Sequence, residues 1–392
     1  MDTRFARRMG CMQPSSIGEI LRAAENPQII SFAGGLPAAE LFPVAEVAAA
    51  VQRTLAEIGP RALQYGVTEG IKPLREWIAA EMGLRGAACG ADEVLVTTGS
   101  QQSLDLLGKI FLDPGDLIIT ENPTYLAAIQ AFQAYEARFL AADTDEDGII
   151  PESVEELAGK HEARFLYVIP NFQNPTGRTL SAARRKALYE VAARRGLIVV
   201  EDDPYGKLRY RGEHIAPLKS LDREGLVIYL STFSKIVAPG FRTGWMVASK
   251  AVRERIVAAK AAADLHTSSL DQLVLERYLR DYDNAKHVEK VRSAYGERYG
   301  IMDGELAKAM PEGYRWTRPD GGMFLWVTGP EGLDSLELLK SALARQIVFV
   351  PGRDFFPDGS GAECMRLNFS NSKPELIREG VKRLAALCSD LP

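Results

Sequence analysis

Short runs of β-branched and other apolar residues alternate with amphipathic helical patterns from about residue 90 onward. This alternation predicts an α/β domain in which helices cover both faces of one sheet. The sheet would hold about seven strands, mostly parallel and buried. The runs expected to form strands are EVLVTT (93–98), DLIIT (116–120), ARFLAA (137–142), RFLYVIP (164–170), GLIVVEDD (196–203), GLVIYLST (225–232) and GWMVAS (244–249).

The part of the chain after residue 250 follows a different pattern. Helical periodicity rich in Ala, Lys and Arg fills 250–310 and predicts a connector between two lobes. A second, α+β lobe is expected from strand-like runs at 318–327, 346–351 and 365–370 and from helices near 335–345 and 374–387. We therefore predict a large domain over 51–285 and a smaller one formed by 286–392 together with 1–50, the N-terminal part packing on the C-terminal lobe.

Composition narrows the class of function. The chain has 392 residues with 47 Lys and Arg against 52 Asp and Glu, and neither sign forms long blocks. Binding to nucleic acid or to a membrane surface is therefore disfavoured, and chemistry on small molecules is favoured. No run is long and apolar enough to cross a bilayer and no leader pattern stands at the N-terminus, so we expect a cytoplasmic protein.

Several common site motifs are missing. The four cysteines form no C-x-x-C pair and lie near no histidine cluster, which argues against a zinc site and a disulfide framework and leads us to expect no metal. The chain has no G-x-x-x-x-G-K-[ST] phosphate loop, no G-x-S-x-G elbow and no H-E-x-x-H pair. Nucleotide, serine-hydrolase and zinc-protease chemistry are thereby disfavoured.

The most informative segment is STFSKIVAPGFRTGW (231–245), which follows an apolar run. It places Ser234, Lys235 and Arg242 in a short loop punctuated by Gly and Pro. A lysine after a strand is ordinarily a solvated surface residue. An amine that forms Schiff bases, however, needs nearby cations or burial to lower its pKa, and a phosphate needs hydroxyls and an arginine fork. The loop offers both sets of groups.

A second candidate for anion binding is TTGSQQSL (97–104), where Gly99, Ser100 and Gln101 stand between a predicted strand and a predicted helix. Free backbone N–H groups and the helix dipole favour a phosphate at such a point. An ordinary serine N-cap with glycine in the turn explains the same letters. Together, the loops at 97–104 and 231–245 could bind one phosphate dianion from two sides.

Two further strands end in polar residues. VVEDDPYGKLRY (199–210) ends an apolar run in Glu201, Asp202 and Asp203, and IPNFQNPTG (169–177) presents Asn174 after another run. Solvated loops and turn chemistry account for both segments. In a doubly wound sheet this edge is also where ligands bind, and there a carboxylate can pair with a protonated ring nitrogen and an amide can meet a ring hydroxyl.

These segments and others resemble fold type I aminotransferases of class I/II, which depend on pyridoxal 5′-phosphate (PLP), in the branch that includes 2-aminoadipate and kynurenine aminotransferases. The resemblance runs over nearly the whole chain, and so many ordered matches make chance an implausible account. It rests on SFAGGLP (31–37), LQYGVTEG (63–70), TTGSQQSLDLLGKIFLDPGD (97–116), ENPTY (121–125), NFQNPTG (171–177), EDDPY (201–205), TFSK (232–235), PGFRTGW (239–245), RPDGGMF (318–324) and MRLNFS (365–370).

The resemblance implies a role for each matching residue. Lys235 would be the Schiff-base lysine and the base that moves a proton during the reaction. Asp202 would pair with the pyridinium nitrogen, and Asn174 and Tyr205 would hydrogen-bond the phenolic oxygen of the ring. The phosphate would be held by Ser100, Gln101, Ser234 and Arg242. Thr232, where many relatives have serine, keeps the hydroxyl and would also contact the cofactor.

The resemblance also implies how substrate and a partner subunit are met. Tyr125 would lie against the cofactor ring, Arg366 would form a bidentate pair with the substrate α-carboxylate, and Gly35 would line the substrate channel. Asn174 and Tyr125 would therefore border both cofactor and substrate. Family members are homodimers with shared active sites, and Tyr65 would reach the phosphate of the neighbouring subunit.

One departure from the family bears on specificity. Several 2-aminoadipate-type relatives carry an arginine in an S-x-I-R-E-[IL] segment that meets the distal carboxylate of the substrate. The corresponding run here is SSIGEI, with Gly18 in place of the arginine. Arg22, one helical turn later, is a candidate substitute, although its ordinary reading is a solvated helix residue.

The sequence thus predicts an aminotransferase that moves the amino group of an L-amino acid to 2-oxoglutarate by a ping-pong mechanism. The donor stays open among 2-aminoadipate, branched-chain, aromatic and a broad range of amino acids. A PLP-dependent C–S β-lyase is the alternative, since elimination needs the same lysine. A PLP-sensing regulatory domain ranks third, because the net charge is acidic and we expect no DNA-binding domain ahead of the fold.

Overall fold

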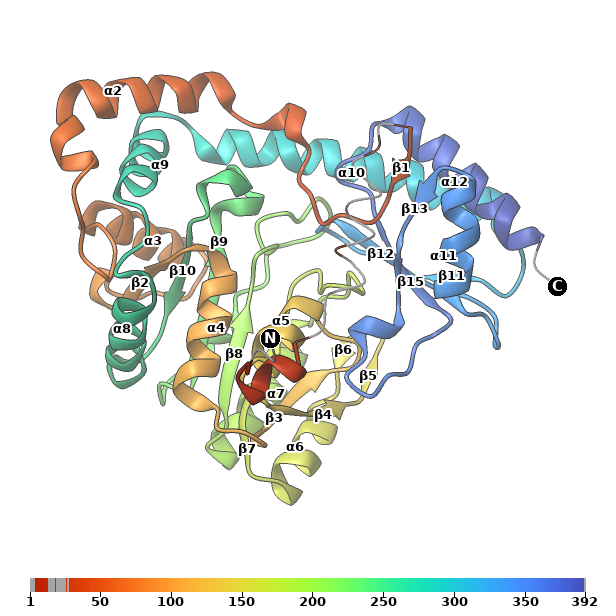
Figure 1. Ribbon diagram of the computed structural model, residues 1–392, viewed down its shortest axis with the longest axis horizontal. Coiled ribbons are helices and arrows are strands. Elements are labelled where there is room, and N and C mark those ends of the chain that lie inside the picture. The colour runs from red at the N-terminus through yellow and green to blue at the C-terminus, as the bar shows by residue number, and fades with distance from the viewer. Residues whose placement is uncertain (1–3, 13–17, 19–25, 27, 391–392) are drawn as a thin grey trace.

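A seven-stranded sheet forms the centre of the computed structural model, which describes residues 4–12, 18, 26 and 28–390 (Figure 1). The strands lie in the order β2-β10-β9-β8-β7-β3-β4. Their bounds are β2 (Val94–Thr97), β3 (Leu117–Glu121), β4 (Arg138–Ala142), β7 (Ala163–Val168), β8 (Ile198–Asp202), β9 (Val227–Thr232) and β10 (Gly244–Val247). β10 runs antiparallel to both neighbours and the other neighbouring pairs are parallel, so the predicted fold class is confirmed.

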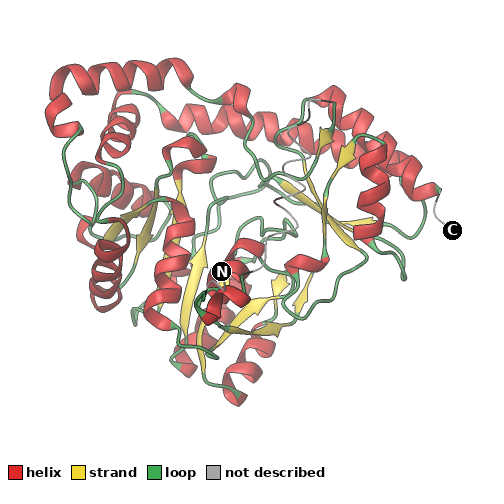
Figure 2. Ribbon diagram, viewed as in Figure 1, coloured by secondary structure: helices red, strands yellow, loops and turns green. Residues whose placement is uncertain are grey.

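Helices cover both faces of this sheet, as Figure 2 shows. The helices around it are α3 (Lys72–Leu84), α4 (Gly99–Phe111), α5 (Leu126–Gln133), α6 (Pro151–Lys160), α7 (Ala182–Arg195), α8 (Lys250–Asp264) and α9 (Ser269–Asp281). Alternate strand residues face opposite layers. Phe165 and Tyr167 pack with α4 and α5, while Leu166 and Val168 pack with α6 and α7. Burial on both faces explains the nearly continuous apolar runs.

The C-terminal part folds around a smaller antiparallel sheet, in the order β11-β12-β15-β14. Its elements are α10 (Asn284–Ala309), β11 (Arg315–Trp316), β12 (Phe324–Thr328), α11 (Ser335–Ala344), β13 (Ile347–Val348), β14 (Val350–Pro351), β15 (Cys364–Asn368) and α12 (Pro374–Ser389). The long α10 runs from the region of the large sheet to this part and packs there against α12 (Figure 1).

The N-terminal segments contact both parts of the molecule. β1 (Ile30–Ser31) pairs in parallel with β13, whereas α2 (Val44–Ala62) lies along α9. Arg7 forms an ion pair of 3.0 Å with Glu136, just after α5. The domain boundaries proposed from the sequence stay a prediction.

Short elements complete the described chain. β5 (Thr144–Asp145) and β6 (Gly148–Ile149) form a hairpin. The 3-10 helices are η1 (Arg7–Gly10), η2 (Ala39–Leu41), η3 (Ala91–Glu93), η4 (Leu218–Leu221), η5 (Phe233–Lys235), η6 (Pro239–Phe241) and η7 (Arg353–Phe355). Among the described helices, none is both long and apolar enough to span a membrane. The described residues also contain no group of three or more His, Cys, Asp or Glu side chains placed to hold a metal.

Candidate active site

A cavity of about 410 Å³ opens at the carboxyl ends of the central strands, against the C-terminal part. This is the edge at which α/β sheets bind ligands. The cavity brings together residues that the sequence placed in separate segments. The predicted residues that line it are Gly35, Ser100, Gln101, Tyr125, Asn174, Asp202, Tyr205, Thr232, Ser234, Lys235, Arg242 and Arg366.

Lys235 enters the cavity from η5, directly after β9. The hydroxyl of Thr232 accepts a hydrogen bond from the Ser234 amide and so caps this short turn. The Lys235 Nζ donates to the carbonyl of Gly35 at 2.8 Å. Burial, together with the positive charges of Arg366 and Arg242, lowers the pKa of Lys235 to about 8. The lowered pKa makes the neutral fraction of this amine at neutral pH much larger than that of a solvated lysine, which favours its action as a nucleophile.

Asp202 ends β8 and lies buried in the cavity wall. Its Oδ2 accepts a hydrogen bond of 2.7 Å from the Tyr167 hydroxyl. Its Oδ1 is buried and has no hydrogen-bond partner among the described residues. Burial, with a further contribution from the charge of Asp203, raises the pKa of Asp202 to about 7. A buried carboxylate oxygen without a hydrogen-bond partner, on a residue that lines a cavity, fits a ligand with a cationic N–H group.

Arg366 reaches the cavity from β15, in the C-terminal part. Its Nη1 donates to Asn174 Oδ1 at 2.8 Å and its Nη2 to the carbonyl of Ala33 at 2.7 Å. The guanidinium carbon lies 4.3 Å from the centre of the Phe324 ring, and the Nε has no partner in the described structure. Burial lowers the pKa of Arg366 to about 10. The group therefore stays a cation at neutral pH, with donor capacity to spare.

Tyr205 and Tyr125 supply hydroxyls to the same cavity. The Asn174 amide donates to the Tyr205 hydroxyl at 3.5 Å, which links Tyr205 through Asn174 to Arg366. Burial raises the pKa of Tyr125, and the charge of Asp202 acts in the same direction. Tyr125 is the residue from which α5 begins. Both phenols are therefore neutral donors near pH 7.

The opposite end of the cavity is built for an anion. α4 begins at Gly99, so the first amide N–H groups of this helix lack partners within it. Gly99 has φ +74°, and a Cβ on it would lie 2.7 Å from Arg242 Nη2. Glycine at this point thus lets the guanidinium approach the helix start. The hydroxyls of Ser234 and Thr232 lie 2.9 Å apart beside it.

Some predicted residues lie elsewhere. Tyr65 does not line the cavity: it is 78% exposed, and its ring meets His266 edge-on with centroids 5.8 Å apart. Gly18 lies in a helical position, and a Cβ on it would meet no described atom within 4 Å. Arg22 lies outside the described residues.

The cavity also contains residues that the sequence reasoning missed. Phe355 and Phe324 flank the Arg366 guanidinium, at 5.1 and 4.3 Å from their ring centres. Leu126 and Gln130, on α5, line the wall. Phe324 was visible in the RPDGGMF run, but Phe355 and the α5 residues carry no local signal because only the chain path brings them here.

Comparison with known proteins decides the family. The model of the family "Aminotransferase class I and II" matches residues 27–384. The chain belongs to this family. It is 43% identical over 388 residues to aromatic-amino-acid aminotransferase 1 of Thermococcus litoralis, covering 97% of this chain and 93% of the relative. The protein is therefore an aminotransferase of the branch that includes 2-aminoadipate and kynurenine aminotransferases, as predicted.

Related solved structures support the assignment of PLP as the cofactor. The chain matches the α-aminoadipate aminotransferase LysN of Thermus thermophilus, complexed with N-(5′-phosphopyridoxyl)-L-leucine, with a TM-score of 0.92 and 42% identity, covering 98% of this chain and 97% of the other. It matches kynurenine aminotransferase of Pyrococcus horikoshii with a TM-score of 0.95 and 41% identity at the same coverage. This aminotransferase depends on PLP. The anion end, the unpartnered Asp202 oxygen and the Lys235 amine fit that cofactor.

The two arginines that flank Lys235 make its amine titration testable in the cofactor-free aminotransferase. We expect an amine-reactive reagent to label Lys235 with a pH midpoint near 8. Arg366→Met removes a nearby cation and should raise the midpoint by about one pH unit. Peptide mass spectrometry across a pH series measures it. Arg318→Met, whose guanidinium faces Asp303, is the control and should leave the midpoint in place; an Arg366→Met midpoint at or below the wild-type value contradicts the assignment.

Proposed function

We propose that this aminotransferase moves the amino group of a broad range of L-amino acids to 2-oxoglutarate by a ping-pong mechanism. One observation carries the proposal: Lys235, Asp202 and Arg366 face the same cavity. An amine, a carboxylate and a guanidinium are the three charges that a cofactor-bound amino acid requires. Donor and acceptor both carry an α-carboxylate for Arg366, so they would occupy this site in turn.

Lys235 is the residue we assign to proton transfer. PLP, when bound, supplies an electron sink for the reacting carbon. Lys235 Nζ would then take the proton from the substrate α-carbon and return it to the cofactor side. The lowered pKa supports this role, because an amine with a pKa near 8 both accepts and releases a proton near neutral pH.

Asp202, Asn174 and Tyr205 are assigned to the ring of the cofactor. The free Oδ1 of Asp202 would accept from the ring nitrogen and hold positive charge there. Asn174 and Tyr205 would donate to the ring oxygen, which a link of 3.5 Å between their side chains supports. Tyr125 would lie against the ring. We assign binding of the phosphate to Ser100, Gln101, Thr232, Ser234 and Arg242.

Arg366 is assigned to the α-carboxylate of the substrate, with Gly35 beside it. Support comes from its unpartnered Nε and from the two rings that hold its plane. The wall beyond it contains Leu36, Leu126 and Phe355, which suit apolar and aromatic side chains. Gln130 adds a neutral amide that a distal carboxylate can meet.

Lys235→Ala tests the core of this proposal. Wild-type protein mixed with PLP should show a near-ultraviolet or visible absorbance band that differs from that of free PLP, and the variant should not show this band. Transamination should fall by about 10³-fold or more, because no other lysine among the described residues lines the cavity to move the proton. Lys340→Ala, on the exposed side of α11, is the matched control. A band at the wild-type wavelength in Lys235→Ala would contradict the assignment of Lys235 as the cofactor lysine.

A donor panel with 2-oxoglutarate as acceptor tests specificity. Leucine, methionine, phenylalanine and 2-aminoadipate are compared by kcat/KM. Because Gly18 supplies no cation for a distal carboxylate, we expect the apolar and aromatic donors to exceed 2-aminoadipate by about tenfold. A wide preference for 2-aminoadipate would show that another cation meets the distal carboxylate.

We further propose that the enzyme works as a homodimer in which Tyr65 reaches the phosphate of the partner subunit. Leu63, Tyr65 and Val67 are exposed on one short segment after α2, an arrangement that favours burial against another chain. The Gly66 amide donates to His266 at 3.1 Å, which ties the segment to the loop between α8 and α9.

Mixing inactive variants tests the shared site. Tyr65→Ala and Lys235→Ala should each be impaired as homodimers. A hybrid dimer restores one site, because Lys235 of one chain then meets Tyr65 of the other, so activity should rise after the two variants are denatured together and refolded. Each variant refolded alone is the control. A monomer in sedimentation, or no gain on mixing, contradicts the proposal.

A further inference from the structure

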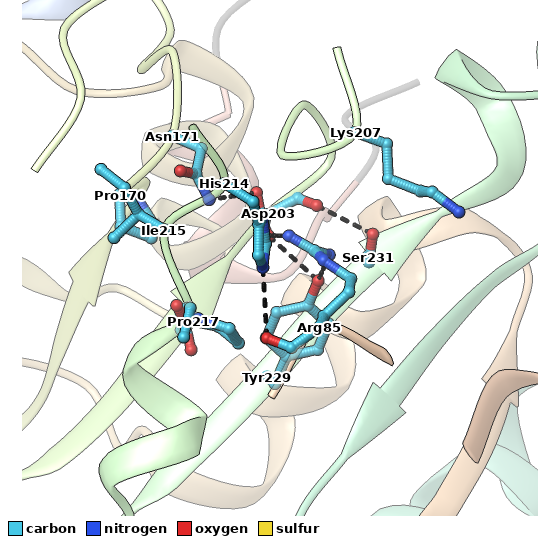
Figure 3. Close-up of polar contacts among 12 residues, drawn as sticks. Arg85, Pro170, Asn171, Asp203, Lys207, His214, Ile215, Pro217, Tyr229 and Ser231 are labelled. Carbon is cyan, nitrogen blue, oxygen red and sulfur yellow. Dashed lines mark hydrogen bonds and ion pairs between the residues drawn. The ribbon is translucent and has the colours of Figure 1, made fainter. Parts of the chain in front are cut away.

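A second buried carboxylate, Asp203, follows the residue assigned to the cofactor ring, and Figure 3 shows it among Arg85, Asn171 and Tyr229. Successive residues of β8 face opposite layers. Val200 packs on the side of α4 and α5, whereas Val199 packs on the side of α6 and α7. Asp202 follows the first side and faces the cavity, while Asp203 meets a residue that follows α3. Asp202 and Asp203 are thus adjacent in the chain but point to opposite sides of the sheet.

Arg85, the residue after α3, neutralises Asp203. Its Nη2 bonds Asp203 Oδ2, and its Nη1 donates to the Tyr229 hydroxyl. That hydroxyl lies 3.1 Å from Asp203 Oδ2 and donates to it. The Asp203 side chain is fully buried and that of Arg85 is only 7% exposed. A side chain at Gly206 would collide with both groups, so glycine is required where the backbone passes this ion pair.

The same cluster holds the loop that carries Asn174. Asn171 Nδ2 donates to Asp203 Oδ1 at 3.0 Å. Arg185 in turn donates to Asn171 Oδ1 at 2.6 Å and to the Pro170 carbonyl at 3.1 Å. On the other side, the Ser231 hydroxyl donates to the Asp203 carbonyl at 2.8 Å, four residues before Lys235. Asp203 therefore touches the segments that lead to Asn174 and Lys235.

Several charged or titratable groups lie near Asp203, on its own strand and on the surrounding elements. They are Arg85 after α3, Arg185 on α7, Glu201 and Asp202 on β8, Tyr229 on β9 and, through the Arg85 carbonyl, His214. Burial by itself would raise the pKa of Asp203, but the charge of Arg85 and the Asn171 hydrogen bond outweigh it and lower the pKa. Asp203 is therefore ionised, and the paired Arg85 offsets part of the negative charge that Asp203 places beside Asp202; the remainder contributes to the raised pKa of Asp202.

We propose that Arg85 is a positioning residue for the cofactor: its ion pair with Asp203 leaves Asp202 as the net negative charge at the ring and fixes the Asn171–Asn174 loop. This inference rests on the role proposed above for Asp202. Arg85 itself touches neither cofactor nor substrate, since it acts from the face of β8 opposite the cavity.

Charge variants separate this role from a purely structural one. Asp203→Asn strands a buried cation behind Asp202, whereas Arg85→Met strands a buried carboxylate. The readout is the pH midpoint of the PLP absorbance band, which reports the proton held at Lys235 Nζ. Relative to wild type, Asp203→Asn should lower the midpoint by about one pH unit and Arg85→Met should raise it. The double variant Arg85→Met/Asp203→Asn carries neither charge and should return towards the wild-type midpoint.

Two further measurements complete the experiment. The dissociation constant for PLP should rise about tenfold in Arg85→Met and recover in the double variant, while the melting temperature of the cofactor-free protein reports the packing loss separately. Arg164→Met, whose partner Asp116 lies at the amino ends of the strands, is the control and should leave midpoint and affinity unchanged. If Arg85→Met does not fold, Asp203→Asn carries the test with the opposite sign.

The outcomes are distinct. Opposite shifts of the two single variants, cancelled in the double, support the proposal. Shifts of one sign, or a double variant farther from wild type than either single, overturn it and leave Arg85 a packing residue. Absence of any Lys235-dependent band in the wild-type protein would instead refute the proposed function.

Discussion

Three consecutive carboxylates, Glu201, Asp202 and Asp203, stand where the buried strand β8 ends, and the neutralisation of their charges determines much of what surrounds them. Two backbone amides of η4 donate to Glu201, at 2.7 and 2.8 Å. Asp203 forms an ion pair with Arg85 and accepts a hydrogen bond from the Asn171 amide. One oxygen of Asp202 accepts a hydrogen bond from the Tyr167 hydroxyl. Burying a charge without such partners costs several kcal/mol, on the order of the whole stability of a domain. The other oxygen of Asp202 is buried and has no hydrogen-bond partner among the described residues, and Asp202 itself lines the cavity.

The cavity itself depends on contact between two distant parts of the chain. Arg366 stands on β15, yet its hydrogen bonds go to Asn174 and to the Ala33 carbonyl. The Lys235 amine also reaches the N-terminal segment, at the Gly35 carbonyl. The residues from 33 to 35 therefore touch both the amine and the guanidinium of the site. A shift of the C-terminal part relative to the central sheet would break the Arg366–Asn174 hydrogen bond, so the position of the Arg366 cation near Lys235 depends on how the two parts pack.

Electrostatics divides the cavity into two ends. Arg242 and the start of α4 form a positive end, and the lining also contains the carboxylate of Asp202 and the guanidinium of Arg366. Burial brings the pKa of Lys235 down to about 8 and that of Asp202 up to about 7, so both groups titrate near neutral pH before a ligand is bound. A ligand that carries a phosphate and a basic ring nitrogen complements both ends at once, and PLP has both groups.

The sequence by itself determined the central sheet, the family and the residue types of the cavity, because apolar runs that are buried on both faces and polar strand ends are local patterns. It also predicted that Lys235, Asp202 and Arg366 would work together, through motifs rather than through distance. The tertiary structure alone decided that Phe355 flanks Arg366, that α5 lines the wall and that Arg85 neutralises Asp203. Arg85 and Asp203 stand more than a hundred positions apart in the sequence. Phe355 and Arg366 are closer in sequence, and they meet because the chain turns back at the small sheet. Their partners are chosen by how strands and helices pack, and no local spacing encodes that choice.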